Sequence, residues 1–181
     1  MAGIAYTAIE TFDPSDQEAW RKYIEWSKLD HLQEIISLDC ALCPTIVPEI
    51  IQQDWNYFAP EYFLFGFFFD LTYLLNRINV NCKHQVIATL REPESNLVTL
   101  LEDKRFHFKG YDLIDEETQI SALTNCGGFD LAFSKNDLSE YGLITDFNQA
   151  FEIKNLLQQH YPDEHHACCT VWAIWKMESD V

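Results

Sequence analysis

The chain has 181 residues and a formal charge of −17, from 29 acidic and 12 basic residues. Apolar residues make up 48% of the chain, which suits one folded domain of ordinary size and argues against disorder. Nucleic acids and anionic membranes carry the same sign of charge as this chain, so we expect it to bind neither directly. We predict a single globular domain over residues 1–181.

The cysteine content and the first residues indicate a reducing compartment. Six cysteines at irregular spacing are too few for a disulfide scaffold. The segment from Met1 to Tyr6 lacks the basic region and the apolar run of a signal peptide. We therefore expect reduced thiols and a cytoplasmic location.

One apolar stretch, from Tyr62 to Ile78, has the composition of a membrane segment. A spanning helix needs about 20 apolar residues, whereas this stretch is shorter and contains Asp70 and Arg77. We therefore predict that a helix over residues 60–77 lies in the core of the protein. No contact with a membrane is expected from it.

The first part of the chain predicts a strand, a helix and a second strand. Residues 4–11 favour a strand, and the helix that follows ends near Lys28. Ser15 and Glu18 have the spacing of a capping box, in which each side chain bonds an unpaired amide of the first helical turn. Residues 32–38 favour the second strand.

The middle of the chain predicts an interior strand and a hairpin. Residues 86–90 are apolar on both faces, as in a strand covered on both sides. Residues 106–108 alternate between apolar and polar, and the strand resumes over residues 111–114. Gly110 between these two runs predicts a β-bulge. Residues 120–123 then return as the second arm of the hairpin.

The last part of the chain contains the clearest patterns. Residues 135–141 predict a short helix that Gly142 ends in the left-handed conformation. Asp146 predicts the N-cap of a helix over residues 147–160, and residues 168–177 predict a strand. One face of this strand carries Val171, Ala173, Trp175 and Met177, and the other carries Trp172 and Ile174.

The order of these elements is β-α-β-α-β-β-β-α-β, with a hairpin and no repeated βαβ unit. This order favours an α+β fold over a doubly wound α/β fold. We predict a single compact domain with a mixed or mainly antiparallel sheet of about five strands, packed by three main helices.

Two clusters of cysteine and histidine contain residue types that bind zinc. Cys40 and Cys43 have the spacing of a zinc knuckle, and His165, His166 and Cys168 lie close together in sequence. Zinc prefers four thiolate or imidazole ligands in a tetrahedron, which Cys40, Cys43, His165 and Cys168 would supply. Buried cysteines, however, often act as small apolar residues. We therefore expect no cofactor and keep a zinc site as the alternative.

Other chemistry has weaker support in the sequence. Cys40, Cys43 and Pro44 have the spacing of a thioredoxin-like redox site, but the surrounding βαβ pattern is absent. Cys126, which precedes two glycines, is a candidate nucleophile without an identifiable base. The acids over residues 112–117 are a candidate cation site without the spacing of a calcium loop. No phosphate-binding loop, HExxH or GxSxG motif is present, so no reaction class is predicted.

The charge and the aromatic content favour a non-catalytic binding protein. A small acidic protein attracts basic partners, and inhibitors, bacterial immunity proteins and nucleic-acid mimics share this charge profile. Aromatic side chains among acids would supply the main contacts, and Trp26, Trp55 and Tyr57 are the candidates. Each of the three is equally consistent with a place in the core. We expect a protein-binding, inhibitor or immunity-type module, with a zinc-binding or thiol-dependent protein as the alternative.

Overall fold

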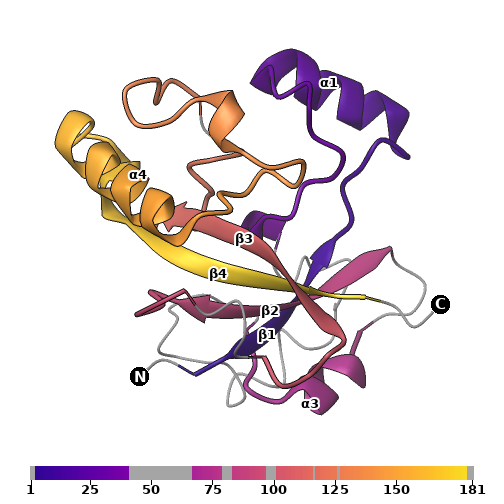
Figure 1. The fold of residues 1–181 in the computed structure, drawn as a ribbon. Helices are drawn as coiled ribbons and strands as arrows, with labels where there is room; N and C mark the ends of the chain where they lie inside the picture. The colour runs from indigo at the N-terminus through magenta and orange to yellow at the C-terminus, as the bar shows by residue number, and fades with distance from the viewer. Residues whose placement is uncertain are drawn as a thin grey trace.

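A four-stranded antiparallel sheet forms the centre of the fold (Figure 1). The computed structural model describes residues 3–40, 67–78, 83–96, 101–115, 117–125 and 127–178. The strands lie in the order β1-β2-β4-β3, and each pairs antiparallel with its neighbours. They are β1 (Ala5–Glu10), β2 (His84–Arg91), β3 (Phe106–Asp115) and β4 (Cys169–Met177). The fold is α+β, as predicted, with four strands in the described residues where about five were expected.

Strand β4 lies inside the sheet, and its side chains alternate between two apolar clusters as predicted. Val171 and Trp175 belong to the cluster on one face of the sheet, and Trp172 and Ile174 belong to the cluster on the other. All four side chains are almost completely buried. Burying a large apolar side chain stabilises a fold by about 2–3 kcal/mol, so this strand anchors both halves of the core.

Short segments cover parts of both outer edges of the sheet. Beside β1, Phe68 and Tyr6 exchange two backbone hydrogen bonds of 2.7 and 2.9 Å. Beside β3, Ile144 and Tyr111 exchange two of 2.7 and 3.0 Å. These pairings satisfy backbone groups that an open edge would offer to another chain.

A β-bulge bends β3 at Gly110, as predicted. The pairing of β3 with β4 shifts register between Phe108 and Gly110, and the φ angle of Gly110 is 147°. The bend brings the backbone of Gly110 against Leu143 and Ile144. Gly142 has a φ of 78°, which confirms its predicted left-handed conformation.

Helix α1 (Gln17–Ser27) begins one residue later than the predicted capping box requires. Its N-cap is Asp16, whose carboxylate accepts a hydrogen bond from the amide of Ala19. The prediction that Ser15 and Glu18 form this cap is therefore wrong, because an aspartate one residue further on fills the same role. The predicted end near Lys28 is confirmed, since Lys28 is the C-cap and has a φ of 60°.

Helix α4 (Phe147–His160) covers one face of the sheet (Figure 1). Its N-cap is Asp146, as predicted, which accepts a hydrogen bond of 2.9 Å from the amide of Gln149. The helix places one apolar stripe in the same cluster as Trp175. That stripe consists of Ala150, Ile153 and Leu157.

The prediction of one continuous helix over residues 60–77 is wrong in its described part. Residues 67–70 are not helical, because Phe68 pairs with Tyr6 on the edge of β1. The helical part that the structure describes is α3 (Leu71–Leu75), with Asp70 as its N-cap. Residues 60–66 lie outside the described residues. No helix in the described part of the chain is long and apolar enough to cross a membrane.

Two further predicted elements are shorter than expected. Residues 32–38 do not form a ladder strand, since Ile35 makes a single bridge to Phe12 before the 3₁₀ turn η1 (Leu38–Cys40). Within residues 135–141, only the 3₁₀ turn η4 (Lys135–Asp137) is helical. In both segments, pairing with distant parts of the chain replaces the local preference.

Candidate interaction site

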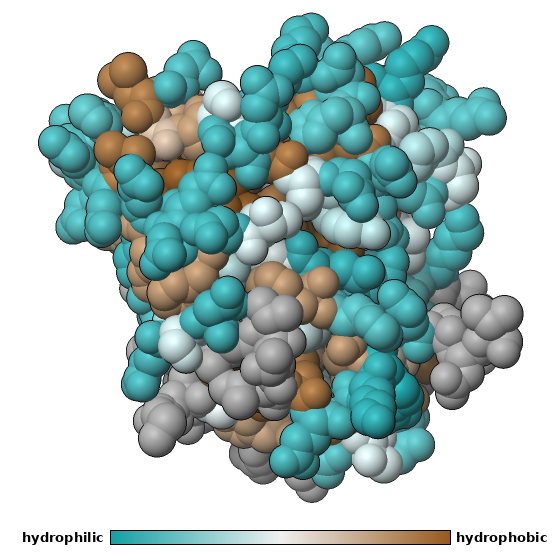
Figure 2. Space-filling model, in the orientation of Figure 1, coloured by the Kyte–Doolittle hydropathy of each residue, from teal (hydrophilic) through white to brown (hydrophobic). Residues whose placement is uncertain are grey.

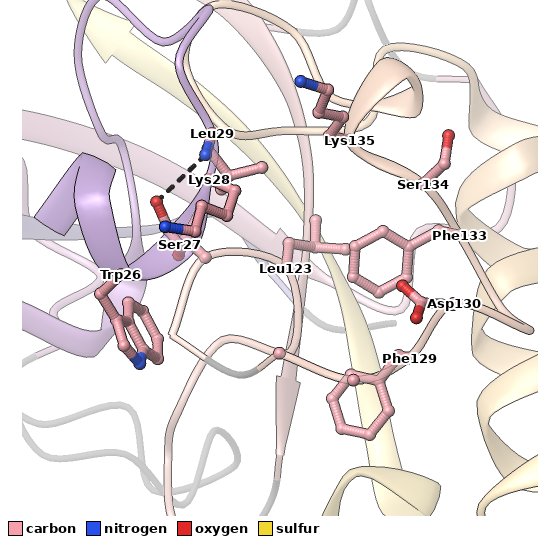
Figure 3. Close-up of a pocket in the computed structure, with 13 residues that line it drawn as sticks. Trp26, Ser27, Lys28, Leu29, Leu123, Phe129, Asp130, Phe133, Ser134 and Lys135 are labelled. Carbon is pink, nitrogen blue, oxygen red and sulfur yellow. Dashed lines mark hydrogen bonds between the residues drawn. The ribbon is translucent and has the colours of Figure 1, made fainter.

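A hollow of about 660 Å³ lies between the C-terminal end of α1 and the loop over residues 123–135. Trp26, at one side of it, faces Leu123, Phe129 and Phe133 across the opening (Figure 3). The volume of the hollow falls within the range of ligand pockets, about 300–1,000 Å³. Hydrophilic side chains dominate the visible face of the molecule around α1 and α4 (Figure 2).

The apolar stripe of α1 explains why Trp26 stands at this hollow. Trp20 and Tyr23 pack on Phe12 with ring centroids 5.4 and 5.6 Å apart, which attaches the helix to the rest of the fold. Trp26 follows Tyr23 by three residues, so it lies on the same stripe, and the two ring centroids are 5.9 Å apart. The stripe continues past the core at this point, and Trp26 is 57% exposed.

Aromatic contacts hold the opposite side of the hollow. The Phe129 ring lies 5.1 Å from the Tyr161 ring and 5.1 Å from the His166 ring, centroid to centroid. The Tyr161 hydroxyl accepts a hydrogen bond of 3.1 Å from the amide of Leu131. Leu131 itself points outward and is 66% exposed. The loop is therefore fixed at its base and presents an apolar side chain at its tip.

The charged groups at the hollow differ in whether they already have partners. The Lys28 ammonium donates a hydrogen bond to the carbonyl oxygen of Glu25, and Lys135 forms an ion pair of 3.1 Å with Asp30. Asp130 lines the hollow, is exposed, and makes no hydrogen bond or ion pair with any described residue. The hollow therefore contains one carboxylate that is available to a ligand.

Two carboxyl groups, Asp39 and Asp112, both bond Ser121, which lies two residues before the wall residue Leu123. Asp112 of β3 is fully buried and accepts hydrogen bonds from the Ser121 hydroxyl at 2.6 Å and the Leu113 amide at 2.8 Å. Burial, with the neighbouring charge of Asp39, raises the pKa of Asp112 to about 7. Burial also raises the pKa of Asp39 to about 6. The two groups titrate as a coupled pair.

Ser121 connects this carboxyl pair to the wall of the hollow. Its amide donates to Asp39, its hydroxyl donates to Asp112, and its hydroxyl oxygen accepts from the amide of Leu123. Thr124, which follows Leu123, accepts a hydrogen bond of 2.7 Å at its carbonyl oxygen from the Tyr23 hydroxyl of α1. Hydrogen bonds therefore connect the carboxyl pair to the turn at the hollow.

Of the residues at the hollow, only Trp26 was a candidate partner-binding residue in the sequence analysis. Trp26 is exposed, as a partner-binding residue must be, whereas Trp55 and Tyr57 lie outside the described residues. No sequence pattern marked Phe133 and Asp130 as candidate site residues, because only the folded loop brings them opposite α1. Asp112 lies in the strand predicted over residues 111–114, but its burial was not predicted, because both faces of β3 are covered from Gly110 to Asp115.

The predicted zinc ligands are only partly described. Cys43 lies outside the described residues. Cys40 is the last residue of the turn η1, and the structure describes its backbone only. His165 and Cys168 share the 3₁₀ turn η5 (His165–Cys168), where both are exposed and His165 lies 3.3 Å from a carboxylate oxygen of Glu117. No group of three or more potential metal ligands occurs within the described part of the chain. Cys126 also lies outside it.

Comparison with known proteins finds no match for this chain among protein-family models, curated proteins or solved structures.

Proposed function

We propose that this protein is a non-catalytic binding module that docks on a basic protein partner through the surface around the hollow. The observation that carries the proposal is the exposed side chain of Trp26 at a hollow with aromatic walls, with a second exposed apolar side chain, Leu131, in the loop that forms the opposite wall. Tryptophan supplies more binding energy at interfaces than most residues do, and interface centres are apolar with a polar rim.

The distribution of ion pairs supports a basic partner. At least seven of the twelve basic side chains already pair with carboxylates of the same chain. They are Arg21, Lys22, Arg105, Lys109, Lys135, Lys154 and Lys176. Most acids in the described part of the chain are exposed, and the field of this surplus accelerates encounters with positively charged proteins.

An inhibitor or immunity-type role follows from this charge and this surface. A protein of this kind acts by covering a basic site of its partner and needs no cofactor of its own. We propose that it does so in the cytoplasm, where its thiols stay reduced. Because nucleic acid shares its sign of charge, the partner is a protein.

A photo-crosslinking amino acid at position 131 is expected to capture this partner. The matched control carries the same amino acid at Leu75 of α3, which is 37% exposed and lies far from α1 (Figure 1). We expect a crosslinked species with position 131 only, formed with a protein of net positive charge, and a yield that falls as salt is raised. Equal crosslinking at positions 131 and 75, or a captured protein of net negative charge, would contradict the proposal.

A further inference from the structure

The two aromatic sides of the hollow fit a flat cationic side chain. Trp26 lies on one side, and Phe133 and Phe129 lie on the other (Figure 3). Aromatic faces attract a cation electrostatically, and tryptophan does so most strongly. A guanidinium group is planar and weakly hydrated, so it stacks on such rings better than an ammonium group does.

The end of α1 adds a negative potential at the same place. The hollow begins at Trp26 and Ser27, the last residues of an eleven-residue helix. The C-terminal end of a helix carries unpaired carbonyl groups and favours cations. The last turn of α1 contains no basic side chain. Lys28, the residue after it, places its ammonium on the carbonyl oxygen of Glu25, in keeping with this preference.

Asp130 supplies the carboxylate that a guanidinium group recognises. It lies between Phe129 and Phe133 at the opening (Figure 3) and has no partner among the described residues. A carboxylate and a guanidinium group form two parallel hydrogen bonds, which fixes the orientation of the bound side chain.

The two lysines that line the hollow do not make it an anion site. The charge of Lys135 is already balanced by Asp30, and the Lys28 ammonium is held at a helix carbonyl. An anion would also approach against the field of a chain with a net charge of −17.

We propose that the hollow receives an arginine side chain of the basic partner, stacked against Trp26 and Phe133 and paired with Asp130. The inference rests on the proposed function, since it names the group by which the partner is recognised.

To test this, the protein is titrated with a blocked pentapeptide that carries one arginine between glycines. The backbone amide signals and the indole N–H signals of the protein are followed by NMR. Matched peptides carry leucine or glutamate at the central position. We expect saturable shifts at Gly127, Gly128 and the Trp26 indole with the arginine peptide alone. Asp130→Asn is expected to weaken this binding about tenfold, as for the loss of a charge-assisted pair. Glu94→Gln, which neutralises an exposed acid elsewhere, is expected to leave it unchanged.

Three results would overturn the inference. Equal binding of the leucine peptide would mean that the hollow takes any apolar side chain. Shifts spread over the whole surface, equally reduced by both substitutions, would mean general charge attraction. Binding of the glutamate peptide would mean that the lysines form an anion site. Each is distinguishable from failure of the proposed function, which the crosslinking at position 131 tests without reference to arginine.

Discussion

The protein is expected to be less stable at about pH 8 than at about pH 5, because Asp39 and Asp112 hold protons in the folded state that they lose when unfolded. Their folded pKa values, about 6 and about 7, lie above the ordinary value of 3.8. A raised carboxyl pKa contributes stability that is complete below the unfolded value and is lost as pH rises through the folded value. The loss therefore falls between about pH 4 and pH 7, and the part of it above pH 5 amounts to roughly 4 kcal/mol.

The substitution Asp112→Asn separates this effect from the repulsion among surface acids, which acts in the same direction. Asparagine is nearly the same size as aspartate and stays neutral, so most of the pH dependence should vanish in urea unfolding measured across this range. Asp130→Asn, at an exposed site, should keep the dependence of the unchanged protein. Equal pH dependence in the two variants would show that Asp112 does not titrate near neutrality, and a carbon-13 NMR titration of its carboxyl group would read this directly.

Gly110→Ala is expected to destabilise the fold by roughly 3 kcal/mol, which lowers the melting temperature by about 10 °C for a chain of this size. A Cβ at this position would lie 2.7 Å from the carbonyl oxygen of Ile144 and 2.7 Å from the Cβ of Leu143. The φ angle of 147° is also one that alanine rarely adopts. Relief of the contacts would disturb the backbone pairing of Tyr111 with Ile144, which covers the edge of β3.

Gly127→Ala is the matched control for this substitution. A Cβ there has no neighbour within 4 Å, so the change in unfolding free energy should stay within about 0.5 kcal/mol. Thermal unfolding followed by circular dichroism measures both variants. Similar melting temperatures for the two would mean that the bulge tolerates a side chain and that the described approach of residues 143 and 144 is wrong.

The elements that the sequence predicted correctly are those that local rules determine. The alternation of β4 and the N-cap of α4 at Asp146 both depend on residues within a few positions of one another. The glycine at the bulge was recognisable for the same reason, because few other residues fit a break in a strand pattern.

The elements that were predicted wrongly depend on pairing between distant segments. Phe68 belongs by composition to a helix, yet its backbone pairs with Tyr6 far away in the sequence. Residues around Ile35 were expected to form a strand, but Ile35 makes only a single bridge with Phe12. A single sequence does not contain this information, since the energy of each pairing is set by the partner segment.

The residues around the hollow show the same difference between local and long-range signals. The aromatic stripe of α1 can be recognised in the sequence from its spacing of three residues. Which of its residues are buried, however, depends on where the sheet lies relative to the helix. Trp20 is therefore partly buried against the core and Trp26 is exposed, although both belong to one stripe. The opposite side of the hollow comes from a loop about one hundred residues further on, and no local pattern pairs the two.

The affinity of the purified partner for Trp26→Ala, measured by isothermal titration calorimetry, tests the binding surface most directly. The loss of an exposed tryptophan should leave folding intact and raise the dissociation constant about thirtyfold, as for a residue that dominates an interface. The control is Phe69→Ala, which removes a second aromatic ring that is 45% exposed, beside α3, and should change the constant less than about twofold. A dissociation constant unchanged by Trp26→Ala, or raised equally by both substitutions, would contradict a docking surface centred on the hollow.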